Sequence, residues 1–522
     1  RDAQESRGLG DVYKRQSLSL GKARCMKTVV PTEKSADELE YSRIFDVHTW
    51  SDHLEVNQFI NLIHEQYFSE PLHDIQKKHL KKLLLDLYLA WVEDPELCIA
   101  VHLNEKQYRA KTRYNLINIS KTTIKVVEKL HTLGLIHLKK GYYDRAPGGK
   151  TRITRIWASQ ELVNHFERVY FSPFEIQIHE DTECIVLHDT DKKPIEYDDT
   201  PETIRMRKLL FSYNQLLRKT HVDCSHLDEP FVLKKDGRKF HISSHNKFVR
   251  RVFNNSSWKQ GGRFYGGWWQ QIGYEHREFI RIDGARTNEV DYSGLHIALL
   301  YARKGLHYYY EAGYNEDPYT IDMPEIQDQE FLRKLAKSVI LMAINASDEK
   351  RAFKAVRHKL NMEGENPSDI SLTDNFLKKV LSKLAEKHTG IADMFLSGAG
   401  VELQYLDSQM TEKIIQYFTS VEVPVLAIHD SYVVPETVAD ILKDRMWDAW
   451  RDVTRLGENE TDPSVKEDLE RTLIKVLNYD LAEGIIDNEW LARIYEFRSK
   501  EYVSPRYKHG LERFKEWRDK KG

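Results

Sequence analysis

Two aspartates, each beside an apolar stretch, are the residues of this sequence best suited to bind metal ions. Asp291 ends the stretch "NEVD", which is followed by "YSGLHI", and Asp430 lies within "VPVLAIHDSYVVP". The second pattern, two apolar runs around His-Asp, predicts a tight β-hairpin. Between the two aspartates, "FLRKLAKSVILMAINAS" predicts a helix on which Arg333 and Lys337 lie one turn apart on the same face.

Each of these features alone has an ordinary structural interpretation, such as a helix cap, a turn or a solvated pair of cations. Their combination and order indicate phosphoryl transfer to the 3′ end of a nucleic acid. The two carboxylates would hold two Mg²⁺ ions, for which Mn²⁺ could substitute; one ion would activate the 3′-hydroxyl and the other would stabilise the leaving pyrophosphate. The cationic helix would hold the triphosphate as negative charge develops.

A basic module precedes these residues and is expected to bind nucleic acid. From 46 to 164 the apolar spacing is mostly helical, as in the amphipathic stretch 79–92. The segment 120–158 predicts a helix ending near Gly134, a strand, a Pro/Gly turn and a second strand, which is the layout of a winged helix-turn-helix. Residues 105–155 contain 13 Lys/Arg against 3 Asp/Glu. The alternative is a solvated basic face on a protein–protein module.

The expected contacts of this module fall into two groups. A recognition helix with lysines every four residues would enter a major groove, and arginines and a lysine of the wing would touch phosphates. The helix residues are Lys121, Lys125 and Lys129, and the wing residues are Arg145, Lys150, Arg152 and Arg155.

Composition excludes several other classes. The 522 residues have a formal net charge of −3, so the chain as a whole has no polyanion-binding signature. The four cysteines are far apart, which argues against a zinc site or a disulfide framework. No apolar run approaches the ~18 residues that span a bilayer, and no signal peptide is visible, so we expect a cytoplasmic, nucleoid-associated protein without a membrane partner. Residues 1–25 begin without Met and resemble translated sequencing-adapter read-through; an ordinary disordered terminus is the alternative.

The second half of the chain resembles the family A polymerase superfamily, which includes the DNA polymerase I type and the single-subunit phage and mitochondrial RNA polymerases. The resemblance covers roughly residues 259–450 and depends on the order and spacing of several motifs. "GGRFYGGWWQ" looks like the Gly-Arg motif before the palm, "VDYSGLHIALLYA" like motif A and "RKLAKSVILMAINAS" like motif B on the fingers helix. "GAGVELQYLDSQM" looks like the helix before motif C, "AIHDSYVV" looks like motif C, and 316–321 falls where the family has Asp-x-His-Thr.

The resemblance implies a role for each matching residue. Asp291 and Asp430 would be catalytic metal ligands, and the carbonyl of Tyr292 would lie beside the metals. Residues that would bind the incoming nucleotide are Arg333, Lys337, His296 and Asn345. Residues that would contact primer and template are Arg263, His429 and Gln404.

Departures from the family leave the choice of sugar open. DNA polymerases of the family usually carry Glu five residues after the first aspartate, where it excludes a 2′-hydroxyl, but this chain has His296. Motif B has Leu341 and Asn345 where an aromatic residue is usual. His-Asp-Ser is typical of the single-subunit RNA polymerases, whereas Asp-Tyr-Ser is typical of the DNA polymerases.

We therefore expect an α+β chain with a right-hand palm and fingers behind a mainly helical winged-helix domain. The expected division is 40–170 for the nucleic-acid-binding domain, 171–199 for a linker or hairpin, 200–262 for a compact thumb-like region, and 263–522 for palm, fingers and C-terminal helices. Pro201 is expected to open a helix. The basic, amphipathic segment 238–253 is expected to contact a duplex backbone, the alternative being a surface helix with solvated charges. The leading hypothesis is a DNA-directed DNA polymerase of a plasmid, phage or mobile element, with primed DNA and dNTP or NTP as partners. The alternatives are an RNA- or primer-synthesising polymerase and a non-catalytic DNA-binding replication initiator.

Overall fold

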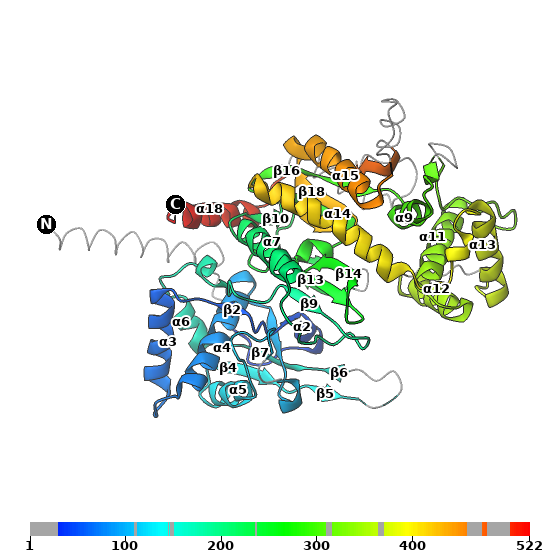
Figure 1. Cartoon of the computed structure of the whole chain (residues 1–522). Coiled ribbons are helices and arrows are strands. Elements are labelled where there is room, and N and C mark those ends of the chain that lie inside the picture. The colour runs from blue at the N-terminus through cyan, green and yellow to red at the C-terminus, as the bar shows by residue number, and fades with distance from the viewer. Residues whose placement is uncertain are drawn as a thin grey trace. The chain divides into compact units, whose positions relative to one another are not determined.

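The computed structural model of the chain divides into two compact units, described separately below. It describes residues 30–108, 112–144, 146, 151–234, 237–309, 316–363, 370–456, 472–477 and 502–521. The first unit comprises 1–183, 221–248 and 493–522, and the second comprises 184–220 and 249–492. Helices and strands are mixed in both units (Figure 1), which agrees with the expected α+β composition. The segment 1–25, expected to be adapter-derived or disordered, lies outside the described residues.

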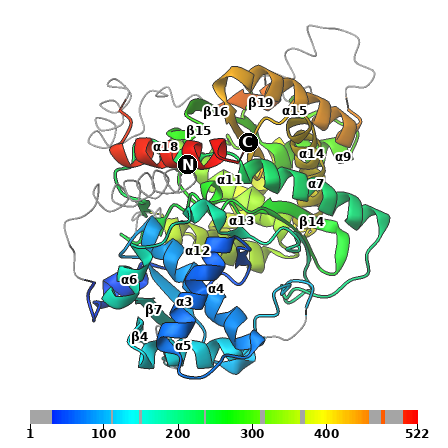
Figure 2. The same cartoon turned by 90° about the vertical axis from the view of Figure 1, so that its left-hand side faces the viewer.

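The first unit is built on a sheet with the strand order β1-β3-β7-β4. β1 is parallel to β3, and the remaining neighbours are antiparallel. Helices α3 and α4 lie side by side (Figure 2) over a core that includes Leu84, Val127 and Ile156, all fully buried. The elements are α2 (Ala36–Glu40), β1 (Ser42–Ile44), β2 (Thr49–Trp50), α3 (Leu54–Tyr67), α4 (Asp74–Glu93), β3 (Cys98–Val101), α5 (Thr122–Thr132), β4 (Ile136–Lys139), β5 (Tyr142–Tyr143), β6 (Thr151–Arg152), β7 (Thr154–Ala158), α6 (Gln160–Phe166), β8 (Gln177–Ile178), β10 (Val222–Cys224), β11 (Phe231–Leu233), β12 (Lys239–His241) and α18 (Pro505–Asp519).

The predicted helix and the two strands that follow it are present as α5, β4 and β7, whereas most of the predicted Pro/Gly turn lies outside the described residues. Gly134 has a φ of 73°, a left-handed conformation that glycine adopts without strain, and α5 ends there as expected. The N–H of Leu135 donates to the carbonyl of Leu130 at 3.0 Å and closes the helix end. β4 then pairs antiparallel with β7.

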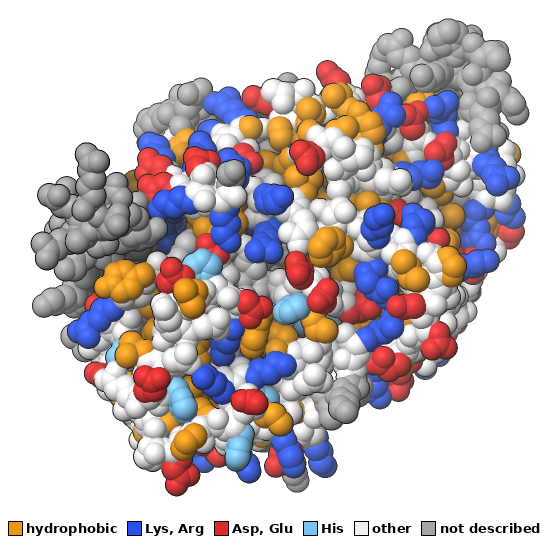
Figure 3. All heavy atoms as spheres, turned by 60° about the vertical axis from the view of Figure 1, so that its left-hand side comes forward, with side chains coloured by type: hydrophobic (Ala, Val, Ile, Leu, Met, Phe, Trp, Pro, Cys, Tyr) orange, Lys and Arg blue, Asp and Glu red, His pale blue; other side chains and the backbone are white. Residues whose placement is uncertain are grey.

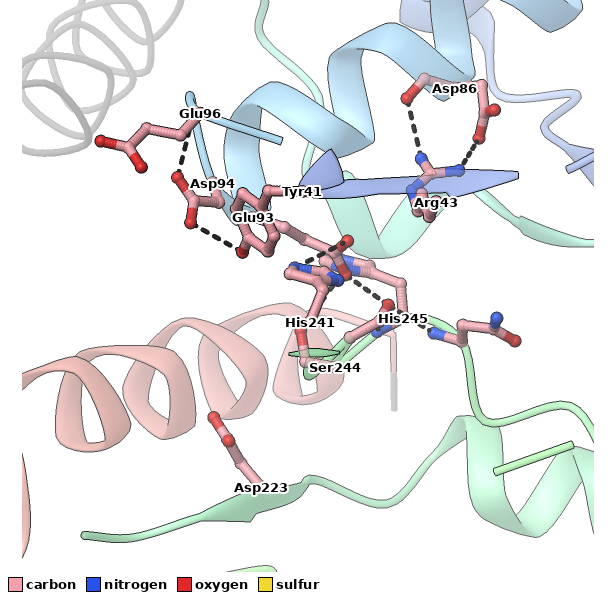
Figure 4. A network of polar contacts seen from close by, with 12 residues as sticks. Tyr41, Arg43, Asp86, Glu93, Asp94, Glu96, Asp223, His241, Ser244 and His245 are labelled. Atoms are coloured by element: carbon pink, nitrogen blue, oxygen red, sulfur yellow. Dashed lines mark hydrogen bonds and ion pairs between the residues drawn. The ribbon is translucent and has the colours of Figure 1, made fainter. Parts of the chain in front are cut away.

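A buried polar network lies at the C-terminal end of α4 in this unit (Figure 4). Glu93 accepts a hydrogen bond from Nδ1 of His245 at 2.8 Å, and Nε2 of His241 lies 3.7 Å from its other oxygen. The Glu93 side chain is only 6% exposed. Nearby, Arg43 donates to Asp86 at 2.7 Å, and the hydroxyl of Tyr41 donates to Asp94 at 2.9 Å. The segment 221–248 is thus tied to α4 by buried charge-assisted contacts.

The second unit contains two sheets that share the long helix α14. One sheet has the order β14-β13-β9, and the other includes β15, β16, β18 and β17 in that order, with β19 paired to β16. α11, α12 and α13 pack together beyond one end of α14 (Figure 1). The elements are β9 (Ile185–Leu187), α7 (Pro201–Arg218), β13 (Arg250–Asn254), β14 (Ser257–Tyr265), α8 (Tyr274–Arg277), β15 (Ile280–Ile282), β16 (Ala285–Tyr292), α9 (Leu295–Arg303), α11 (Gln329–Asn345), α12 (Glu349–Glu363), α13 (Asp374–Lys387), α14 (Gly400–Ser420), β17 (Leu426–Ile428), β18 (Ser431–Pro435), α15 (Ala439–Thr454) and β19 (Ile474–Val476).

The structure corrects the prediction for residues 238–253. They form β12, a loop and the start of β13, and no surface helix. Arg251, expected to be solvated or to touch a duplex, is 1% exposed and forms a buried ion pair with Glu412 of α14. The proposed thumb-like stretch 200–262 is divided between the two units, and α18 near the C-terminus belongs to the first unit. Pro201 opens α7 as expected.

Charged side chains of both signs are interspersed on the face that Figure 3 shows, as the small net charge suggests. None of the helices in the described part of the chain combines the length and the hydropathy that crossing a lipid bilayer requires.

Candidate active site

Asp291, near the end of β16, and Asp430, in the turn just before β18, lie at the same end of a shared β-ladder. β16 and β18 pair antiparallel, with Asp291 opposite Ser431, and the N–H of Tyr292 donates to the carbonyl of Asp430 at 3.1 Å. β17 and β18 form the predicted hairpin, because Ile428 pairs with Ser431 across a turn of two residues. The first residue of that turn, His429, has a φ of 57°. The strands therefore bring together two aspartates that are far apart in sequence.

The two carboxylates repel one another in a partly dehydrated setting. Burial, the charge of Asp430 and the charge of Glu289 raise the pKa of Asp291 to about 8, against the opposing charges of Lys337 and Arg277. A carboxylate pair of this kind is disfavoured when both members are ionised without a cation. Mg²⁺ and Mn²⁺ prefer such carboxylate oxygens, so the donor set fits the two-metal expectation. Among the described residues, no group of three or more His, Cys, Asp and Glu side chains is arranged to hold a metal ion.

A third acid, Glu289, supports this strand end and was not identified from the sequence. It is 4% exposed, and both of its oxygens accept hydrogen bonds from Arg277, at 2.9 and 3.0 Å. The hydroxyl of Ser431 also donates to Glu289, at 2.6 Å. Because side chains alternate along a strand, the spacing of two residues puts Glu289 and Asp291 on one face of β16. The alternation along the predicted strand could have pointed to Glu289 as a neighbour of Asp291. The sequence does not show that Arg277 and Ser431 are its partners.

Arg263, predicted to touch primer and template, is instead engaged inside the unit. Its Nε donates to Asp407 of α14 at 2.6 Å, and a terminal nitrogen lies 3.2 Å from Nε2 of His296. The Arg263 side chain is 13% exposed, and that of Asp407 is fully buried. Burial and Asp430 raise the pKa of Asp407 to about 6 against the lowering effect of Arg263. Burial and the charge of Arg263 lower the pKa of His296 to about 4. Sequence reasoning missed Asp407.

The predicted cations of α11 share one exposed face, as expected. Arg333 and Lys337 both lie over the ring of Tyr319, at 5.7 and 5.5 Å from its centroid. Nε of Arg333 also pairs with Asp317 at 2.6 Å, within the stretch that matched the family's Asp-x-His-Thr position. Burial and the charge of Asp430 raise the pKa of Tyr319, and Lys337 acts on Asp291, so this face is electrostatically coupled to the aspartate pair.

The remaining predicted residues of the second unit surround this centre or pack its elements. The ring of His429 meets the edge of Tyr265 at 5.6 Å. The side chain of Tyr292 is buried and donates to a backbone carbonyl, and its backbone belongs to β16. Asn345 donates to the carbonyl of Leu341 at 2.7 Å and lies against Gly400, where a Cβ would collide with it. Gln404 is half-buried on α14.

The first unit carries the predicted nucleic-acid-binding residues, with one correction. Lys121, Lys125 and Lys129 are all exposed on α5. Lys121 pairs with Glu105 at 3.1 Å, but both side chains are about two-thirds exposed and such pairs are weak. The guanidinium of Arg152 lies 5.2 Å from the ring centre of Tyr142. Arg145 and Lys150 lie outside the described residues.

Arg155 was expected on the wing, and this prediction is wrong. The residue is 7% exposed on β7, and it donates to the carbonyls of Leu39 at 2.8 Å and Ile153 at 2.7 Å. Its register position faces the interior of the unit, where the guanidinium satisfies backbone acceptors, so it is not available to a phosphate.

The chain matches no protein-family model and no curated protein sequence. The likeness to the family A polymerases therefore rests on the order and spacing of the motifs in the sequence.

Proposed function

We propose that this protein is a template-directed nucleotidyltransferase, most simply a DNA-directed DNA polymerase of a plasmid, phage or mobile element, acting on DNA in the cytoplasm. The observation that carries the proposal is that β16 and β18 place Asp291 opposite Ser431, next to Asp430 in the preceding turn, with a pKa of Asp291 raised to about 8 by burial and by its neighbours. A site that concentrates repelling carboxylates is costly for folding, and divalent cations offset that cost.

The chemistry follows from what each part of the site can do. Asp291 and Asp430 would hold two Mg²⁺ ions, with Mn²⁺ as a substitute, and the bound ions would activate the 3′-hydroxyl and stabilise the leaving pyrophosphate. Arg333 and Lys337 would bind the triphosphate of the incoming nucleotide, since both cations share the exposed face of α11. Tyr319 lies beneath both cations and limits their freedom.

The first unit would hold nucleic acid in this proposal. Three exposed lysines on α5, Lys121, Lys125 and Lys129, form a basic stripe with the spacing that tracks phosphates along a groove. The order of α5, β4 and β7 supports the proposal of a winged helix-turn-helix in this region. It would bind an origin or the template.

The sugar of the nucleotide substrate distinguishes two candidate functions, DNA synthesis and RNA or primer synthesis. The Asp-Tyr-Ser sequence at the end of β16 favours deoxynucleotides, whereas His-Asp-Ser and His296 favour ribonucleotides. RNA or primer synthesis is therefore the second candidate function.

Extension of a labelled primer on one template, with dNTPs or NTPs and with Mg²⁺ or Mn²⁺, tests the proposal. We expect incorporation by the wild type and a loss of roughly 10³-fold in both Asp291→Ala and Asp430→Ala, because the charge stabilisation by bound metal is worth several kcal/mol. Asp452→Asn, on an exposed pair of α15, is the matched control and should retain full activity. No incorporation of either nucleotide class would overturn the proposal. DNA binding by the wild type without any synthesis, unchanged in both alanine variants, would favour the non-catalytic initiator.

A further inference from the structure

Three side chains from three elements form a continuous chain of polar contacts beside the aspartate pair. Asp407 comes from α14, Arg263 from β14 and His296 from the first turn of α9. The carboxylate of Asp407 accepts from Nε of Arg263 at 2.6 Å, and a terminal nitrogen of the same guanidinium contacts Nε2 of His296 at 3.2 Å. Asp407 is 0% exposed. The arginine is therefore held at one end by a buried acid and meets the imidazole at the other.

The contact between Arg263 and His296 determines which nitrogen of the imidazole carries the proton. A guanidinium has five N–H donors and no acceptor, so the nitrogen that it contacts must accept. Nε2 of His296 is therefore unprotonated, and the neutral ring carries its proton on Nδ1. The nearby positive charge and the burial of His296 both disfavour a second proton, which agrees with the lowered pKa of this residue.

The series of contacts from Asp407 through Arg263 to His296 ends at the candidate active site. His296 follows Asp291 by five residues, and Gly294, with a φ of 62°, turns the backbone between β16 and α9. The charge of Asp430 acts on both His296 and Asp407. Within the described residues, the ring of His296 is hydrogen-bonded through Nε2, which leaves the Nδ1–H for a substrate atom. A polar N–H beside a substrate site is then a donor for the substrate.

We propose that Asp407 is a positioning residue which, through Arg263, fixes His296 in the Nδ1–H tautomer, so that His296 donates to a neutral oxygen of the bound nucleotide. The inference rests on the proposed function. A neutral acceptor matches a single uncharged N–H, whereas the charged phosphates match Arg333 and Lys337 of α11. Asp407 acts through Arg263 and does not itself touch the nucleotide.

Two substitutions at His296 distinguish the contribution of Nδ1 from that of Nε2. In His296→Asn the side-chain amide lies near the position of Nδ1, and in His296→Gln it lies near the position of Nε2. We expect His296→Asn to keep kcat/KM within about threefold of the wild type and His296→Gln to lose roughly 5–10-fold, the range for one neutral hydrogen bond. Equal losses in the two variants would overturn the proposal. Repeating the comparison with NTPs, dNTPs and 2′,3′-dideoxy nucleotides identifies which sugar oxygen accepts.

A double-mutant cycle tests the role of Asp407. Asp407→Asn should lower kcat/KM in the wild-type background by less than His296→Gln does, roughly two- to fivefold, because part of the His296 population keeps the Nδ1–H tautomer. It should have little effect in the His296→Asn background, because the amide at position 296 has no tautomers to select. A loss of the same size in both backgrounds would show a merely structural role and overturn the proposal. If Asp407→Asn does not fold, Arg263→Lys replaces it, because lysine keeps the charge but lacks the fork that reaches both partners.

A second measurement does not depend on catalysis and separates failure of this inference from failure of the proposed function. Nitrogen NMR of the full chain labelled at histidine, without metal or substrate, should show His296 protonated on Nδ1 in the wild type and a mixture of tautomers in Asp407→Asn. A wild-type ring protonated on Nε2 would overturn the inference even if the enzyme polymerises. An Nδ1-protonated ring in an inactive wild type would leave the inference about the tautomer intact and refute the proposed function.

Discussion

Replacing Asp291 by Asn should stabilise the metal-free protein at alkaline pH while abolishing its proposed activity. The substitution removes one charge from a pair that repels, and it keeps the size of the side chain. Burial, Asp430 and Glu289 raise the pKa of Asp291 from 3.8 to about 8. A raised carboxyl pKa means that the folded state holds a proton which the unfolded state releases, so stability falls as the pH rises from about 4 to about 8.

The gain in stability on replacing Asp291 by Asn follows from the rise in its pKa from 3.8 to about 8. Roughly 1.4 kcal/mol per pH unit gives a ceiling of about 5–6 kcal/mol, and residual solvation of a half-buried carboxylate reduces it to an expected 2–3 kcal/mol. For a domain of this size, 1 kcal/mol corresponds to roughly 2–4 °C in Tm. We therefore expect Asp291→Asn to unfold about 5–10 °C above the wild type at pH 8 in EDTA, and close to it at pH 5.

Thermal unfolding followed by fluorescence at pH 5, 6, 7, 8 and 9 measures this difference directly. Asp452→Asn, which removes a charge from an exposed pair with Lys413, is the control and should change Tm by little at any pH. Added Mg²⁺ should raise the Tm of the wild type and not that of Asp291→Asn, because binding to the folded state stabilises it. A Tm difference that is the same at pH 5 and pH 8, or a less stable Asp291→Asn at pH 8, would refute the reasoning about the carboxylate pair.

Three further predictions concern stability and nucleic-acid binding. Glu412→Gln should destabilise the second unit by roughly 3–5 kcal/mol in thermal unfolding, because it leaves Arg251 buried without its partner; a shift as small as that of Asp452→Asn would contradict this. Burial alone would raise the pKa of Glu93, but His241 and the hydrogen bond from His245 lower it to about 2, so its contribution is present above about pH 4.5 and is lost toward pH 2. Glu93→Gln should therefore lose roughly 2–3 kcal/mol at pH 6 and show a flatter stability curve between pH 5 and 3, measured by urea unfolding; parallel curves would be the contrary result. Replacing the three exposed lysines of α5 by Ala should weaken duplex DNA binding and reduce the salt dependence by about 0.9 per lost phosphate contact in fluorescence anisotropy; an unchanged slope would remove α5 from the interface. These residues are Lys121, Lys125 and Lys129.

The parts of the site that the sequence predicted correctly depend on short-range patterns. Asp430 lies between two apolar runs that can only form a tight hairpin, and Arg333 and Lys337 follow the helical repeat. Gly134 and Pro201 mark helix ends by their own backbone preferences. In each case the residue and the few around it contain the whole signal.

The parts that the sequence did not predict depend on pairings between distant segments. Asp407 is one acid on a helix that has others, and only its partner Arg263, from a strand 144 residues away, distinguishes it. The segment 238–253 contains several cations at spacings that suit a helix, but its strands are determined by partners elsewhere in the chain. The assignment of 221–248 and α18 to the first unit is of the same kind, because no local pattern records which unit a segment joins.

Three arginines show why the sequence overstated the positive charge available to nucleic acid. Arg155, Arg251 and Arg263 were each assigned an external role, and their exposed fractions are 7%, 1% and 13%. Arginine is weakly hydrated and offers a rigid fork of donors, so it is the cation that folds inward when carboxylates or carbonyls can receive it. The lysines of α5 keep their compact, strongly hydrated charges in solvent. Among the described residues, the electrostatic case for nucleic-acid binding by the first unit therefore excludes Arg155 and rests on exposed cations such as the lysine stripe of α5.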